Sequence, residues 1–244
     1  MTIVRTILLH DGLLHDGPGD RFESMVVADD AAASPRPGIL LFPNVLGTKE
    51  ADFAYAEQVA ALGYCVLVVD VFGQGKRTTR ADANPAVYMN ALNADRALLR
   101  DRLHAAHALL RGLDNVDAAR TAAIGFCFGG KCVLDLARSG ADMAGGVSFH
   151  GVYDAPPFPA RAIAAKLLIC HGWDDPIAPP AATVALATEL TQAGCDWQVH
   201  AYGHTGHAFT DHSVNMPDKG LAYSPAADRR SFRAMRDFLD DLFG

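Results

Sequence analysis

Short apolar runs alternate with stretches of helical periodicity along most of the chain. The apolar runs predict buried strands at 38–42, 64–70, 121–126, 145–150, 166–171 and 197–202. The periodic stretches between and after them predict helices at 49–62, 129–138, 180–193 and 226–243. This alternation is typical of an α/β fold, with a mostly parallel central sheet and helices on both of its faces.

Turn and capping residues mark where several of these elements begin and end. Gly63 is the expected residue just beyond the helix at 49–62. Asn84 and Pro85 predict the N-cap and first residue of a helical stretch that runs to Gly112, as one helix or two. Small and polar residues at 28–37 predict a loop between an opening hairpin and the sheet.

Length and composition favour a single domain, 1–244, with a sizeable core. The chain has 244 residues, of which 50% are hydrophobic and 20% charged, and α/β folds often use about 200–250 residues as one unit. These values exclude a disordered, collagen-like or disulfide-stapled chain. The net charge of −7 argues against nucleic acid as a partner.

Location and redox state follow from what the sequence lacks. The N-terminus does not resemble a signal peptide, and no apolar run reaches about 18 residues, so we expect a cytoplasmic protein with no membrane partner. The five cysteines are odd in number and form no CxxC pair, which favours reduced thiols.

The most informative motif is the run Gly125-Phe126-Cys127-Phe128-Gly129, which joins a predicted strand to a predicted helix. It matches the nucleophile elbow, with cysteine in place of the more usual serine. The two glycines are needed because side chains on either side of so sharp a turn would collide with the strand and the helix. The helix N-terminus would favour the thiolate of Cys127.

Two later loops supply the partners that such a nucleophile requires. Asp175 follows one predicted strand and His207 follows the next, and nucleophile, acid, histidine is the chain order of the α/β-hydrolases. His207 is predicted to take the proton of Cys127, or to stabilise its thiolate, while Asp175 orients the imidazole. Asp174 and His204 are the alternatives for these two roles.

Backbone amides are expected to hold the oxyanion. The N–H of Phe128 and one from the loop after residue 42, Val45, are the candidates. A metal site built from His204, His207 and His212 is not favoured, because these residues lie in a glycine-broken loop and no HExxH motif occurs.

Taken together, the motifs resemble the dienelactone hydrolase family over most of the chain. The resemblance rests on the order and spacing of six segments, which are Phe42-Pro43-Asn44-Val45-Leu46-Gly47, 63–73, G-F-C-F-G-G at 125–130, Gly172-x-x-Asp175, 206–210 and 227–243. It implies a cofactor-free, metal-free Cys-His-Asp hydrolase of small esters or lactones that works through an acyl-enzyme, typified by conversion of dienelactone to maleylacetate.

The chain departs from this family at one position. Many members carry a glutamate where this sequence has Asn44, and that carboxylate is thought to help form the thiolate. We therefore expect Cys127 to be paired with His207 in the resting enzyme. The side chains expected to surround a substrate are Asn44, Phe126, Trp173 and Phe209.

Two alternatives to this function stay open. One is a promiscuous carboxylesterase or thioesterase, and the other is a hydrolase homologue that binds a ligand without turnover. Lys76, Arg77 or Arg80 could bind a substrate carboxylate, or could equally form a solvated turn. The protein is expected to be a monomer or a small homo-oligomer.

Overall fold

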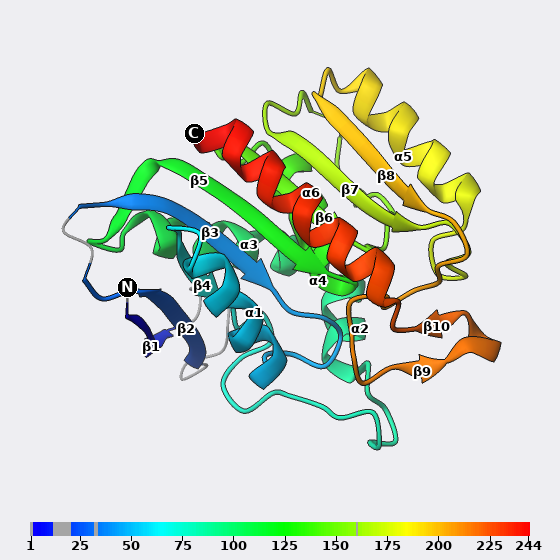
Figure 1. Ribbon diagram of the computed structural model, residues 1–244, viewed down its shortest axis with the longest axis horizontal. Helices are drawn as coiled ribbons and strands as arrows, with labels where there is room; N and C mark the ends of the chain where they lie inside the picture. Colours follow the sequence, from blue (N-terminus) through cyan, green and yellow to red (C-terminus); the bar gives the residue numbers. More distant parts are fainter. Residues whose placement is uncertain (1, 12–20, 32–33, 160) are drawn as a thin grey trace. The chain divides into compact units, whose positions relative to one another are not determined.

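The computed structural model describes residues 2–11, 21–31, 34–159 and 161–244, and Figure 1 shows its elements. The chain forms two compact units, Met1–Ala123 and Ile124–Gly244. The single-domain organisation expected from the sequence stays a prediction.

The first unit has strands in the spatial order β1-β2-β4-β3-β5. β1 pairs antiparallel with β2, β2 antiparallel with β4, and β4 parallel with β3. Every residue of β3 and β4 is buried, as expected for a strand covered on both faces. The bounds are β1 Ile3–Asp11, β2 Arg21–Asp29, β3 Arg36–Phe42, β4 Cys65–Val68 and β5 Val116–Phe126, with helices α1 Glu50–Ala60, α2 Val87–Ala94 and α3 Arg96–Arg111.

Local sequence explains both ends of α1. The carboxylate of Asp52 accepts the backbone N–H of Lys49 at 2.9 Å, which satisfies a donor that the helix itself leaves unpaired. Beyond the helix, Gly63 has φ +104°, a conformation that glycine adopts without a steric cost. The helix itself ends at Ala60, two residues before the predicted end at Leu62.

The stretch from 84 to 112 contains two helices, and its predicted start is wrong. α2 begins at Val87 with Ala86 as its N-cap, so Asn84 and Pro85 lie outside it. The hydroxyl of Thr78 donates to the carbonyl oxygen of Pro85 at 2.7 Å and holds that residue in the preceding loop. Asp95 separates the helices by capping α3, since its side chain accepts the N–H of Leu98.

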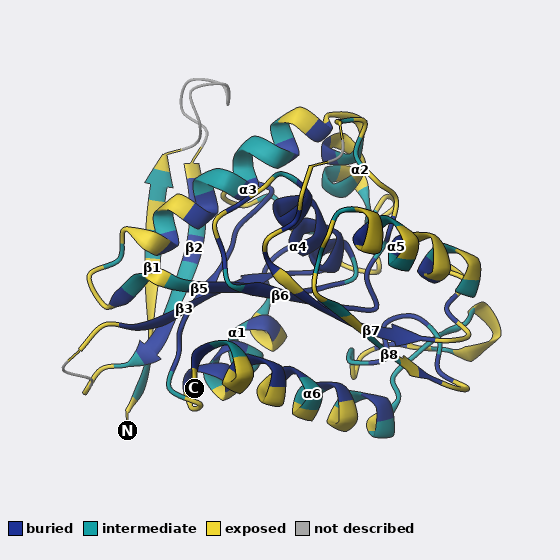
Figure 2. Ribbon diagram, turned by 90° about the horizontal axis from the view of Figure 1, so that it is seen from above, coloured by how far each residue is buried: buried dark blue, intermediate teal, exposed yellow. Residues whose placement is uncertain are grey.

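The second unit has three parallel strands in the order β6-β7-β8, next to the last three residues of β5. In Figure 2, α4 and α5 lie on one face of these strands and α6 on the other. A short antiparallel pair, β9 and β10, occupies the segment after β8 that the sequence left without structure. The bounds are α4 Phe128–Arg138, β6 Gly145–Phe149, β7 Lys166–Gly172, α5 Pro180–Gln192, β8 Trp197–Tyr202, β9 Asn215–Met216, β10 Leu221–Ala222 and α6 Pro225–Phe243.

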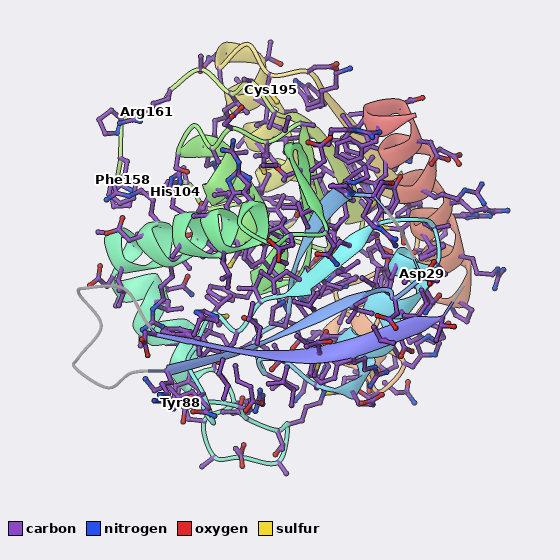
Figure 3. All side chains as sticks on the ribbon, turned by 90° about the vertical axis from the view of Figure 1, so that its left-hand side faces the viewer. Asp29, Tyr88, His104, Phe158, Arg161 and Cys195 are labelled. Atoms are coloured by element: carbon purple, nitrogen blue, oxygen red, sulfur yellow. The ribbon has the colours of Figure 1, made fainter. Side chains whose placement is uncertain are left out.

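Mostly parallel strands with helices on both faces confirm the predicted α/β class. The cysteines outside the elbow mostly pack in the core, since Cys65, Cys132 and Cys170 are buried. Cys195, labelled in Figure 3, follows α5 and is partly exposed. Among the helices that the structure describes, none has the length and apolar character needed to cross a membrane.

Candidate active site

Cys127 stands on a sharp turn between β5 and α4. Its backbone has φ +54°, a left-handed conformation that is rare for any residue other than glycine. The turn is held on both sides, because the N–H of Cys127 donates to the carbonyl of Phe149 at 3.0 Å and its carbonyl accepts the N–H of Lys131. The cysteine is partly exposed at the start of α4, where the helix dipole favours negative charge.

Close backbone packing explains the glycines around this turn. A Cβ on Gly125 would overlap the carbonyl group of Gly129, which is the collision expected from the sequence. Gly130 is equally constrained, because a Cβ there would lie 2.6 Å from the hydroxyl of Ser148 and 2.8 Å from the Cα of Gly151. The second constraint has no local signal in the sequence, since β6 and the residues after it create it.

The structure brings Asp175 and His207 together in the second unit. Nδ1 of His207 donates to Oδ2 of Asp175 at 2.7 Å, and both side chains are almost completely buried. The other carboxylate oxygen of Asp175 accepts the N–H groups of Ile177 and Ala178, so the carboxylate has a fixed orientation. The alternatives do not share this arrangement, because Asp174 and His204 are exposed.

A stack of three glycines fixes the backbone of the His207 loop. A Cβ on Gly172 would overlap the carbonyl of Gly206, and a Cβ on Gly206 would overlap the carbonyl of Gly220. Hydrogen bonds complete the attachment, since His207 N–H donates to Gly220 O at 2.8 Å and Ala222 N–H donates to His207 O at 3.2 Å. The β9–β10 pair therefore holds His207 on the side away from β7.

Charge at Cys127 and Asp175 controls the protonation of His207. Burial alone would lower the pKa of the ring, but the negative sulfur of Cys127 and the carboxylate of Asp175 outweigh burial and raise this pKa to about 10. Nε2 of His207 is buried, and no described group reaches it with full hydrogen-bond geometry. The Cys127 sulfur acts on His207 both through its charge and as a hydrogen-bond partner, and catalytic hydrogen bonds are often poorly aligned in enzymes without substrate.

Two further histidines lie near His207. His150 presents the edge of its ring to the His207 ring, with centroids 5.1 Å apart at 70°. His171 is fully buried, burial lowers its pKa, and its Nδ1 accepts the hydroxyl of Tyr153 at 3.1 Å. The neutral His171 ring adds little charge beside Asp175. The sequence placed both histidines at strand ends but gave no sign of these contacts.

Asn44 and Val45 lie in the first unit, in the turn after β3. The side-chain oxygen of Asn44 accepts the N–H of Leu46 at 3.0 Å, and its backbone oxygen accepts the N–H of Gly47 at 3.1 Å. Asparagine commonly stabilises a turn in this way. The turn gives Asn44 a structural role of its own, and the part of Val45 in an oxyanion hole stays a prediction.

The aromatic residues expected around the substrate differ in exposure. Trp173 is 43% exposed, Phe126 is 7% exposed, and Phe209 has no exposed surface. Phe209 packs against His150 and Tyr202, with ring centroids 5.0 and 5.5 Å apart. In this structure Phe209 therefore packs within the core beside His150, and its contact with a substrate stays a prediction.

The structure also shows the surroundings of the basic side chains that could bind a substrate carboxylate, and of the possible metal ligands. Arg77 forms an ion pair with Glu23 at 3.0 Å and donates to the hydroxyl of Thr48 at 2.8 Å. It is therefore already occupied within the first unit, while Lys76 is partly exposed and Arg80 exposed. Within the described part of the chain, no group of three or more His, Cys, Asp or Glu side chains is arranged to hold a metal ion.

Comparison with known proteins gives the chain a family. The dienelactone hydrolase family matches residues 22–243. A solved structure of a dienelactone hydrolase-like promiscuous phosphotriesterase from metagenomic libraries superposes with a TM-score of 0.90 and 32% identity, covering 99% of each chain. A dienelactone hydrolase from Anabaena variabilis, at 18% identity, shares the fold with a TM-score of 0.65 over 98% of this chain and 99% of that one.

A curated relative from Methylorubrum extorquens, provisionally named a carboxymethylenebutenolidase, is 28% identical over 73% of this chain and 65% of its own length. An uncharacterized protein from Caenorhabditis elegans is 32% identical over 59% of this chain and 94% of its length. The fold is that of the α/β-hydrolases, and a small-molecule substrate follows from the family. The chain belongs to the dienelactone hydrolase family, and it is a hydrolase.

Proposed function

We propose that this hydrolase cleaves a small carboxylic ester or lactone through Cys127, with His207 as general base and acid and Asp175 as the residue that orients it. One observation carries the proposal. The imidazole of His207 is fixed by Asp175 at 2.7 Å and is close enough to the Cys127 sulfur for the sulfur's charge to raise its pKa. This arrangement supplies a nucleophile, a base and an orienting carboxylate.

The first half of the reaction forms an acyl-enzyme. The thiolate of Cys127 attacks the carbonyl carbon, forming a C–S bond and a tetrahedral oxyanion. The oxyanion then collapses and the C–O bond of the ester breaks. Protonated His207 gives its proton to the leaving alkoxide, which departs as an alcohol or, for a lactone, stays attached as a hydroxyl group.

The second half restores the enzyme. Neutral His207 takes a proton from water, whose oxygen forms a new C–O bond to the acyl carbon while the C–S bond breaks. The products are a carboxylic acid and the Cys127 thiolate facing protonated His207. The amide of Phe128, at the N-terminus of α4, is the proposed donor to the oxyanion in both halves, and Val45 is the proposed second donor.

Removing the sulfur tests this function. Cys127→Ala is expected to lower hydrolysis of p-nitrophenyl acetate and of dienelactone by at least about 10³-fold, because both halves of the reaction pass through the sulfur. Cys195→Ser is the matched control, since Cys195 is also partly exposed but lies outside the site. Unchanged hydrolysis by Cys127→Ala would rule the proposal out.

The choice of substrate separates the remaining alternatives. A preference for dienelactone supports the lactone reaction, whereas equal rates on p-nitrophenyl acetate and simple thioesters support a broad esterase. If the wild type turns over none of a wide ester and lactone panel but binds its members, the chain is a ligand-binding homologue.

A second candidate activity is hydrolysis of phosphotriesters. It is favoured by the similarity to the promiscuous phosphotriesterase, which extends over nearly all of both chains. Paraoxon is the probe, and the same Cys127→Ala variant tests whether one nucleophile serves both reactions. Hydrolysis of paraoxon that survives this substitution would assign the activity to other groups.

A further inference from the structure

His150, the residue directly after β6, has a backbone conformation that needs an explanation. Its φ is +37°, in the left-handed region that histidine seldom adopts, and it is only 2% exposed. A buried side chain held at a positive φ indicates that its surroundings constrain it, and the contacts of the imidazole show which neighbours do so.

The backbone of this segment is tied to β7 and to the turn that follows β5. The N–H of His150 donates to the carbonyl of Cys170 at 2.8 Å, and the carbonyl of Phe149 accepts the N–H of Cys127 at 3.0 Å. The imidazole of His150 is therefore carried by the same segment that fixes the proposed nucleophile. Its position relative to the Cys127 turn is set by the sheet and not by a mobile loop.

The ring of His150 contacts the His207 loop at three points. Nε2 bonds to Oγ1 of Thr210 at 2.8 Å, and the ring edge packs against His207 at 5.1 Å and against Phe209 at 5.0 Å. All three partners lie in the segment 207–210. His150 therefore braces this loop from the sheet side, while Gly220 and Ala222 hold its backbone from the other side.

A brace is useful because the His207 ring has a single hydrogen bond with good geometry, from Nδ1 to Asp175. One hydrogen bond fixes one point of the ring, so the tilt of the ring about that point is set by the side chains packed around it. The perpendicular contact with the ring of His150 limits the tilt of the His207 ring on one side. It leaves Nε2 of His207 available to Cys127, its partner in the proposed reaction.

We propose that His150 is a positioning residue that, with Thr210, holds the imidazole of His207 in register with Cys127. The proposal rests on the proposed function, in which Cys127 and His207 form the reacting pair. His150 itself touches no reacting atom in this role.

Replacement of the ring separates positioning from packing. His150→Phe keeps an aromatic ring but loses the bond to Thr210, and His150→Gln keeps a polar group that can bond to that hydroxyl. Thr210→Val removes the hydroxyl from the other side. His204→Phe is the matched control, because His204 also has a positive φ, +55°, lies in the same loop and is exposed.

The expected effect is on the chemical steps. With p-nitrophenyl acetate, His150→Phe should lower kcat by about 10- to 100-fold with KM within about twofold, as expected for a misplaced base. Thr210→Val should lose a smaller factor in kcat. The double variant, which carries both substitutions, should lose less than the product of the two single losses, because the two residues act through one contact. His150→Gln should keep most of the wild-type kcat. His204→Phe should match the wild type.

Alkylation of Cys127 by iodoacetamide, followed by mass spectrometry across pH, gives a readout that does not need turnover. His150→Phe should shift the alkylation profile of Cys127 to higher pH, because a displaced imidazolium stabilises the thiolate less. A lower melting temperature with unchanged kcat and an unchanged profile would show that His150 only packs, and would overturn the proposal. If His150→Phe does not fold, Thr210→Val decides the question by the same criteria.

The failure of the proposed function would look different. In that case the wild type would show no hydrolysis that depends on Cys127, whatever residue stands at position 150. The alkylation profile would still report whether His150 changes the pairing of Cys127 with His207, so the two failures can be told apart.

Discussion

Substitution of Gly206 by alanine tests whether backbone packing sets the position of His207. Gly206 directly precedes His207, and a Cβ at this position would overlap the carbonyl oxygen of Gly220. Gly203 offers a matched control three residues earlier, because a Cβ there would meet no described atom within 4 Å. The two variants differ only in which of these glycines receives the same methyl group.

The size of the effect follows from the distance that the loop must move. Real Cβ atoms essentially never approach another heavy atom closer than 3.0 Å, so the overlap at Gly206 requires a shift of about 1 Å to reach even this limit. The carbonyl oxygen of Gly220 also accepts the N–H of His207 at 2.8 Å, so the shift passes directly to His207. A misplacement of about 1 Å costs about 10²-fold in rate, or about 2.7 kcal/mol in the activation barrier.

Steady-state kinetics with p-nitrophenyl acetate and a thermal melt provide the measurement. Gly206→Ala should lose about 100-fold in kcat/KM, mostly in kcat, because substrate contacts are retained while the base is displaced. Gly203→Ala should keep the wild-type rate and gain at most about 0.4–1 kcal/mol of stability. A folded Gly206→Ala variant with wild-type kcat/KM would refute the reasoning, since it would show that the loop can relax without moving the imidazole.

Three further predictions concern charge and packing. Because the pKa of His207 is raised from 6.5 to about 10, its charged ring stabilises the fold fully below about pH 6.5 and loses this effect as the pH rises through about 10. Iodoacetamide should accordingly alkylate Cys127 at a high rate well below pH 8. His207→Gln should abolish this alkylation at low pH. Gly125→Ala should yield little folded protein on expression, because the methyl group would overlap backbone atoms that cannot move aside. Arg138→Met should lower the free energy of unfolding by about 3–5 kcal/mol in a urea titration, since it removes a buried guanidinium that pairs with the buried carboxylate of Asp135 and the partly exposed carboxylate of Glu189. Arg236→Met, at an exposed ion pair, should lower it by about 0–1 kcal/mol. Equal losses for the two arginine variants would contradict the structure.

Much of the fold could be predicted because its strands are continuously apolar and its helices are periodic. The strand at 197–202 has the predicted bounds, and the helix after Cys127 begins one residue earlier than expected. The start of α2 was missed for a specific reason. Asn84 and Pro85 carry a valid capping signal, but a hydrogen bond from Thr78 draws Pro85 into the loop. A contact of this kind is not visible in local sequence.

The residues of the candidate site likewise fall into those that local sequence predicts and those that only distant contacts define. The sequence singled out Cys127, Asp175 and His207 because each follows a strand in a recognisable order, and the structure brings the last two into contact. His150, Gly220 and the β9–β10 pair carry no such order, because their roles depend on neighbours 13 or more residues away or on a two-residue ladder too short to show periodicity. The turn formed by Asn44 could not be predicted from the sequence either. The resemblance to the family draws attention to the glutamate that is absent at this position, whereas in the structure the side chain of Asn44 accepts a hydrogen bond from the N–H of Leu46.

The stack of Gly172, Gly206 and Gly220 has a practical consequence for redesign. A side chain at Gly172 or Gly206 would meet main-chain atoms, which no mutation elsewhere can remove, and a side chain at Gly220 would meet Pro176 and would have to adopt φ +68°. A mutagenesis library should leave the codons of these three glycines constant and place its diversity at exposed positions such as Trp173 and Ile177. Variants with a different substrate preference could then be selected at these exposed positions, while Asp175 and His207 keep their 2.7 Å contact.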